Sequence, residues 1–192
     1  MIGVGMAAVA QQDLPERLFV IVDGPPASGK TTLARPLAVC LGLPLLAKDR
    51  IKDTLMEVLP PPDVEASRVL GRAAVAAMLA VAVDSPVGAV LESNFYRSRA
   101  ARELGQLPGP IVEVFCRCDR QVALNRYRLR AGTRSAGHFD ALRTDEEIWN
   151  PEISEPVAAG WPVIEVDTSQ PVDVVSVVQL IRQAVALRDS IP

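Results

Sequence analysis

The 192 residues carry 20 Lys and Arg against 23 Asp and Glu, so the formal net charge is −3. That balance does not favour a broad nucleic-acid-binding surface, although local basic clusters remain open. Three cysteines and one histidine suit neither a zinc site nor a redox pair, so reduced thiols and a cytoplasmic location are expected. The length fits one domain, with residues 1–16 as a mobile leader and 17–192 as the folded part. We expect no run long enough to span a membrane.

Short apolar runs alternate with helical patterns along the chain. Strands are predicted at 17–23, 43–47, 87–91, 111–116 and 163–166. Helices are predicted at 29–41, 50–59, 64–84, 97–107, 119–131 and 172–188. The 64–84 helix is apolar nearly all round and is expected to be well buried. The alternation predicts an α/β fold, a three-layer sandwich around a parallel five-stranded sheet.

The glycine-rich stretch between the first strand and the first helix carries the strongest functional signal. Its sequence, GPPASGKT at 24–31, has the spacing and the strand–loop–helix context of a phosphate-binding loop. Lys30 would reach the β- and γ-phosphates of a nucleotide and act in catalysis, and the Thr31 hydroxyl would hold Mg²⁺. The alternative is a glycine turn with a chance Lys-Thr pair. The residues expected to bind the nucleotide here are Gly24, Ala27, Ser28, Gly29, Lys30, Thr31 and Thr32.

Further polar residues follow the second and third strands. Ligands of parallel sheets bind beyond the carboxyl ends of the strands, so these residues are expected to share one rim with the glycine-rich loop. Asp49 would accept the proton of an acceptor hydroxyl, or cap a helix that begins at Arg50, and the two roles are compatible. Glu92 would hold a metal or order the nucleophile, or be a solvated strand end, and Asn94 is a weaker candidate beside it.

A basic cluster lies beside Asp49. Lys48, Arg50 and Lys52 suit an anionic acceptor, or are simply solvated. Lys52 is therefore a candidate substrate contact.

The segment 120–145 is predicted to be a mobile lid. Arg126 and Arg130 are four residues apart and so lie on one helical face, where phosphates would relieve the repulsion between their charges. The alternative is an ordinary solvated face. We prefer the lid because the helix continues into a Gly- and Arg-rich loop. His138 in this loop either contacts the substrate or makes a local hydrogen bond.

Six stretches together resemble a known group of enzymes. GPPASGKTTLA, PLLAKDRIKDTLME, VLESNF, FCRCD, ALNRYRLRA and GHFD resemble the small P-loop kinases of the AAA-family ATPase-like group. That group is similar to chloramphenicol phosphotransferase, zeta-toxin kinases and the kinase domain of bacteriophage polynucleotide kinase. The resemblance covers roughly residues 18–168.

The resemblance implies several further features. It implies the sheet order 2-3-1-4-5, Asp49 as the general base, and Arg126 and Arg130 in the lid. It also places Thr168 at the adenine edge of the site. A second acidic metal ligand at a strand end is not obvious in this sequence, where only Glu92 is available.

The sequence thus predicts an ATP- and Mg²⁺-dependent phosphotransferase with a hydroxyl group as acceptor. The acceptor would be a small molecule such as an antibiotic, a sugar or a nucleoside-like metabolite. A polynucleotide 5′-hydroxyl kinase is one alternative and would need an electropositive channel to the glycine-rich loop. A nucleotide-dependent switch without phosphoryl transfer is the other. Neither the acceptor nor the oligomeric state follows from the sequence.

Overall fold

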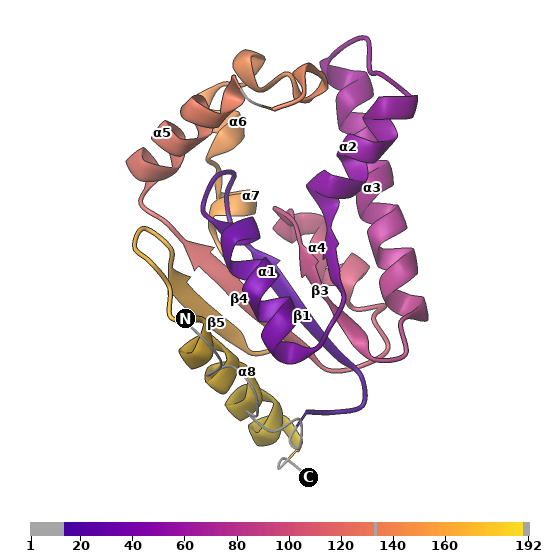
Figure 1. The fold of residues 1–192 in the computed structure, drawn as a ribbon, viewed down its shortest axis with the longest axis vertical. Helices are drawn as coiled ribbons and strands as arrows, with labels where there is room; N and C mark the ends of the chain where they lie inside the picture. Colours follow the sequence, from indigo (N-terminus) through magenta and orange to yellow (C-terminus); the bar gives the residue numbers. More distant parts are fainter. Residues whose placement is uncertain (1–13, 133, 190–192) are drawn as a thin grey trace, which may run out of the picture.

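A computed structural model of the chain describes residues 14–132 and 134–189. Most of the predicted leader lies outside these ranges. Five parallel strands form a sheet in the order β2-β3-β1-β4-β5, which confirms the expected topology (Figure 1). Every residue of β1 is buried, because this central strand is covered on both faces and its sequence is a continuous apolar run. The strands are β1 (Leu18–Asp23), β2 (Leu45–Ala47), β3 (Gly88–Glu92), β4 (Ile111–Arg117) and β5 (Val163–Asp167).

Helices cover both faces of the sheet and complete the three layers. Two of them, α1 (Lys30–Leu41) and α8 (Val174–Asp189), pack on one face, where Leu37 and Ile181 are fully buried. The other face is covered by α3 (Val64–Asp84) and α4 (Arg97–Leu104). The remaining helices are α2 (Lys48–Val58), α5 (Arg120–Ala131), α6 (Asp145–Ile148), α7 (Pro151–Ser154) and the 3₁₀ turns η2 (Ala136–His138) and η3 (Asp140–Leu142).

The predicted burial of α3 is wrong. Only one stripe of this helix is fully buried, made of Ser67, Ala74, Met78 and Ala82. Val75 and Leu79 beside it are half-buried against the core, and Val69, Val81 and Val83 are exposed. Alanine and valine fill most positions around the helix, so its sequence gives no clear polar face from which to read the exposed side. The expectation that no run reaches membrane-span length also needs correction. By length and composition alone, α3 would be long and apolar enough to cross a membrane. In this fold 22% of its most apolar 18-residue stretch is buried.

An arch of short elements extends beyond the carboxyl ends of the strands. It begins with α5, whose first turn is capped by Asp119 as its Oδ1 accepts a hydrogen bond from Val122 N at 3.1 Å. The chain then passes over η2 and η3 toward the ends of α2 and α3 (Figure 1). Ser67 links α3 to the arch, because its hydroxyl donates a hydrogen bond to the Gly137 carbonyl at 2.6 Å. The arch and the sheet edge together enclose the space in which the predicted site residues lie.

Candidate active site

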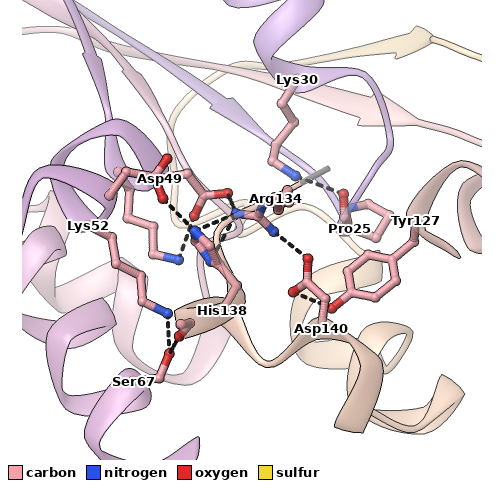
Figure 2. A network of polar contacts seen from close by, with 12 residues as sticks. Pro25, Lys30, Asp49, Lys52, Ser67, Tyr127, Arg134, His138 and Asp140 are labelled. Carbon is pink, nitrogen blue, oxygen red and sulfur yellow. Dashed lines mark hydrogen bonds and ion pairs between the residues drawn. The ribbon is translucent and has the colours of Figure 1, made fainter. Parts of the chain in front are cut away.

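The glycine-rich loop has the backbone that its sequence predicts. Gly24 and Gly29 have φ angles of 140° and 94°, which side-chain-bearing residues rarely adopt. A Cβ at Gly24 would lie 2.7 Å from the Cys116 carbonyl oxygen, so the loop also needs glycine there to pack against β4. Lys30 Nζ donates to the carbonyls of Gly24 and Pro25 at 2.8 and 2.7 Å (Figure 2). Lys30 thus contacts the carbonyls of its own loop.

Asp23, the residue before this loop, is an anchor that the sequence analysis missed. Its Oδ1 accepts hydrogen bonds from Gly24 N at 2.6 Å and from Phe95 N at 2.9 Å. The carboxylate therefore joins the start of the glycine-rich loop to the segment after β3. Burial raises the pKa of Asp23 to about 7, although the two backbone donors oppose that rise. The only feature of the sequence that pointed to this role of Asp23 is its position between a buried strand and Gly24.

Glu92 and Thr31, the two predicted metal residues, lie together. Glu92 is the last residue of β3 and is 5% exposed. Burial raises the pKa of Glu92, while the Lys30 ammonium and a hydrogen bond with the Thr31 side chain act in the opposite direction. Within the described ranges no group of three or more His, Cys, Asp and Glu side chains could hold a metal ion by itself. Glu92 and Thr31 could still contribute two oxygen ligands to an ion whose other ligands come from phosphates and water.

Asp49 lies in the first turn of α2 and not at the cap of the helix. The helix begins at Lys48, its cap position is Ala47, and no side chain caps it, so the predicted capping role of Asp49 is wrong. The Asp49 carboxylate instead forms ion pairs with two cations. Lys48 Nζ lies 2.9 Å from Oδ1 and Arg134 Nη2 lies 2.8 Å from Oδ2. Burial alone would raise the pKa of Asp49, but these cations outweigh it and hold the pKa well below its usual range.

Arg134 stands at the centre of a polar network that crosses the site (Figure 2). Besides Asp49 it binds Asp140, with Nη1 3.0 Å from Oδ2, and Asp140 Oδ1 accepts the Tyr127 hydroxyl at 2.8 Å. His138 packs beside the guanidinium and lies 2.5 Å from Asp53 Oδ1 on α2. These contacts join the arch to α2. The contact of His138 with Arg134 is local, as one sequence interpretation expected, whereas its contact with Asp53 joins residues 85 positions apart, and His138 also lines the cavity described below.

Three of the four arginines of α5, Arg126, Arg128 and Arg130, have different surroundings. Arg126 donates to the carbonyls of Thr168 and Ser169 at 3.0 and 3.2 Å, so it binds the loop after β5. The Arg130 guanidinium lies over the Tyr127 ring at 5.4 Å. Arg128 lies on a different face of the helix and pairs with Asp145. Arg126 and Arg130 both line the cavity described next.

A cavity of about 680 Å³ gathers most of the predicted residues. It adjoins a second cavity of about 930 Å³, which lies between α3 and α4 and shares Lys48, Lys52, Ser93, Asn94 and Arg143 with the first. Gly24 and Ser28 are the two predicted residues that do not line the first cavity. Those that do are Ala27, Gly29, Lys30, Thr31, Thr32, Asp49, Lys52, Glu92, Asn94, Arg126, Arg130 and Thr168.

Comparison with known proteins identifies the group to which this architecture belongs. No protein-family model and no curated protein matches the chain. Among solved structures, a protein described as a putative kinase from Chloroflexus aurantiacus J-10-fl is 30% identical, with a TM-score of 0.77. The match covers 88% of this chain and 99% of that one. This chain belongs to the P-loop kinases.

Two other structures share the fold of this P-loop kinase. A gluconokinase from Sinorhizobium meliloti 1021 is 19% identical over 90% of this chain and 93% of its own, with a TM-score of 0.56. A shikimate kinase from Acinetobacter baumannii is 20% identical over 94% and 97%, also with a TM-score of 0.56. The predicted likeness of this P-loop kinase to chloramphenicol phosphotransferase and zeta-toxin kinases stays a prediction.

Proposed function

We propose that the chain is a kinase that transfers the γ-phosphoryl group of ATP to a hydroxyl of a small molecule, with Mg²⁺ as cofactor. The observation that carries this proposal is the pair of adjoining cavities. One contains the glycine-rich loop and Asp49, and the other is a separate space of about 930 Å³ that opens onto the first. A kinase binds two substrates, so it needs a nucleotide site and an acceptor site that adjoin at the γ-phosphate. Two structures with this fold are also named for small-molecule acceptors.

Nucleotide and metal would occupy the first cavity. The backbone N–H groups of residues 27–31, which include the N-terminus of α1, suit phosphate oxygens, and Lys30 would leave its two carbonyl partners for the β- and γ-phosphates. Thr31 and Glu92 would hold Mg²⁺. When bound, the ion would neutralise charge on the phosphate oxygens.

Asp49 would orient the acceptor in the transfer step. The acceptor oxygen would bond to the γ-phosphorus as the bond to the β–γ bridging oxygen breaks, which leaves ADP and a phosphate ester. The hydroxyl proton would pass to Asp49. A carboxylate with a low pKa is a weak base, but the loose transition state of phosphoryl transfer demands little proton abstraction before the oxygen attacks. Positioning is then the larger contribution of Asp49.

The arch over the cavity would act as the lid. Arg130 and Arg134 line the cavity beside the glycine-rich loop, so bound phosphates would offer them new anionic partners. If Arg134 turned to the nucleotide, Asp49 would lose one of its two cations and its pKa would rise toward its ordinary value. Nucleotide binding would in this way also release the carboxylate for the acceptor.

The two alternatives from the sequence remain outcomes of the test. A nucleotide switch has no use for a second cavity beside the phosphates. A polynucleotide kinase needs an electropositive track. The second cavity is lined by six basic residues together with Asp84, Glu103 and Glu147, and two of the basic residues, Arg68 and Arg72, pair with carboxylates.

Incubation with γ-labelled ATP and a panel of hydroxylated metabolites, antibiotics and a 5′-hydroxyl oligonucleotide tests the proposal. We expect label to appear on a small-molecule acceptor in a Mg²⁺-dependent reaction that Lys30→Met abolishes. Transfer to the oligonucleotide alone would favour the polynucleotide kinase. Tight ATP binding with no transfer to any acceptor would favour the switch.

A further inference from the structure

Lys52 is a buried cation without a carboxylate partner. The side chain lies on α2, is 2% exposed, and lines both cavities at the point where they meet. Its ammonium donates to Ser67 Oγ at 2.7 Å, and the described residues place no carboxylate within ion-pair distance of it. Burial and the nearby charges of Lys48 and Arg143 lower the pKa of Lys52 to about 8. A buried charge is costly unless an opposite charge joins it.

Arg143 is a second cation at the place where the two cavities meet, which we call the neck. It follows η3 and lines both cavities, so its charge lies close enough to lower the pKa of Lys52. In the part of the chain that the structure describes, its guanidinium has no carboxylate partner, and its buried Nε has no hydrogen-bond acceptor. Two like charges held together in this way favour the binding of an anion.

The other basic side chains of the second cavity already have partners. Arg68 pairs with Glu147 at 2.8 Å, and Arg72 pairs with Glu65 at 3.3 Å. Arg99 lies over the Tyr96 ring at 4.9 Å. Arg99 is exposed to solvent, so among the described residues of this cavity the buried positive charge without a carboxylate partner is confined to the neck.

We propose that the phosphate acceptor carries an anionic group, a carboxylate or a phosphate ester, which binds between Lys52 and Arg143. This inference rests on the proposed kinase function and names the class of its acceptor. Lys52 follows Asp49 by three residues in α2, so the two side chains lie on one face with Cβ atoms about 5–6 Å apart. An anion on Lys52 and a hydroxyl on Asp49 would then be separated by only a few bonds. A hydroxy acid or a small sugar phosphate has this arrangement.

Matched pairs of compounds that differ in the anionic group test the inference. The pairs are D-gluconate with D-sorbitol, D-glycerate with glycerol, and D-ribose 5-phosphate with D-ribose. Each is titrated by calorimetry into protein saturated with ADP and Mg²⁺, so the phosphate-binding loop is already filled. We expect the anionic member of at least one pair to bind at least about tenfold more tightly, as a buried charge-assisted hydrogen bond would give. The first two pairs report a carboxylate and the third a phosphate ester.

Two variants and one control locate the effect. Lys52→Met and Arg143→Met keep side-chain bulk but remove the charge, and each should reduce the preference for the anion by about tenfold or more. Arg102→Met removes an equal charge from an exposed position of α4 outside both cavities and should leave the preference unchanged. Equal affinity for both members of every pair, or a preference that survives in both neck variants, would overturn the inference.

The same titrations separate this inference from the kinase proposal. ATP-dependent phosphorylation of neutral alcohols, with no preference for anions, would uphold the kinase and overturn the anionic acceptor. An anion preference that depends on Lys52 and Arg143, with no phosphoryl transfer to any compound, would uphold the anion site and count against the kinase.

Discussion

Arg134 reaches from the arch to Asp49 across the nucleotide cavity, with Nη2 2.8 Å from Oδ2. The two residues are 85 positions apart in the chain, and this ion pair links the proposed lid to the proposed acceptor-orienting carboxylate. The same guanidinium also binds Asp140 within the arch. A movement of the arch therefore changes the electrostatic environment of Asp49 directly.

Arg134→Met should raise the pKa of Asp49. The variant removes one of the two cations that hold this pKa well below its usual range, while Lys48 keeps the other. Carbon-13 NMR of the aspartate carboxyl groups across a pH titration measures the shift. Arg128→Met serves as the control, because Arg128 lies on the same arch but pairs with the exposed Asp145. Identical Asp49 titrations in Arg134→Met and the parent protein would contradict the electrostatic link.

Lys30→Met should weaken ATP binding by about 10- to 100-fold, since it removes charge-assisted hydrogen bonds to the phosphates. Calorimetric titration with ATP and Mg²⁺ measures the loss. Arg35→Met removes an equal charge from an exposed position of the same helix and should bind ATP as the parent does. Thermal unfolding should be measured alongside the titration, because Lys30 is buried and its charge is the main one that lowers the pKa of Glu92. Unaltered ATP affinity in a folded Lys30→Met protein would remove the phosphate-binding role of this loop.

The parts of the structure that could be predicted depend on local patterns. The run at 18–23 and the glycine spacing at 24–31 define a strand, a loop and a helix start within fourteen residues, and all three are confirmed. The rim of polar residues also follows, because a parallel sheet brings the carboxyl ends of its strands together.

The parts that could not be predicted depend on contacts between distant segments. Lys52 donates to Ser67 of α3, and Ser67 donates in turn to Gly137 of the arch. No pattern around Lys52 in the sequence predicts either contact. Asp23 becomes an anchor only because Phe95 N points at it from the segment after β3. A cation or carboxylate at a strand end therefore indicates a site, but not the partner with which it is paired.

Asp23→Asn should change how stability depends on pH. The folded protein raises the pKa of Asp23 from 3.8 to about 7, so it holds this proton more tightly than the unfolded chain. That contribution to stability is fully present below pH 3.8 and is lost as the pH rises through about 7, at up to about 1.4 kcal/mol per pH unit. Asparagine does not titrate and keeps an oxygen acceptor for Gly24 N and Phe95 N.

Urea unfolding of both proteins between pH 5 and 8 measures this difference. The free energy of unfolding of Asp23→Asn should rise relative to that of the parent as the pH increases, by an amount on the order of a few kcal/mol over the range. Asp84→Asn, at an exposed position at the end of α3, is the control and should follow the parent. Parallel curves for the parent and Asp23→Asn would show that the burial of Asp23 costs nothing at neutral pH.

Asp49→Asn tests the residue that the mechanism places at the acceptor hydroxyl. Asparagine keeps the shape of the side chain and an oxygen for Lys48 or Arg134, but it cannot take the proton. General-base catalysis typically contributes ~10²–10⁴-fold, and because proton abstraction is the smaller contribution of Asp49, turnover on an identified acceptor should fall by about 10²-fold, the lower end of that range. ATP affinity should survive, because the glycine-rich loop is unchanged. Stability should change by less than about 1 kcal/mol, since the Asp49 side chain is 39% exposed and caps no helix.

Turnover, ATP titration and thermal unfolding measured together separate a chemical role for Asp49 from a structural one. Asp145→Asn is the matched control, because it breaks an exposed ion pair of the same arch with Arg128 and should keep turnover near that of the parent. A folded Asp49→Asn protein with near-normal turnover would reduce Asp49 to an ion-pair partner of Arg134. A fall in turnover together with an equal fall in ATP affinity would instead show that this ion pair positions the arch for the nucleotide, and would move the role of Asp49 from the acceptor to the lid.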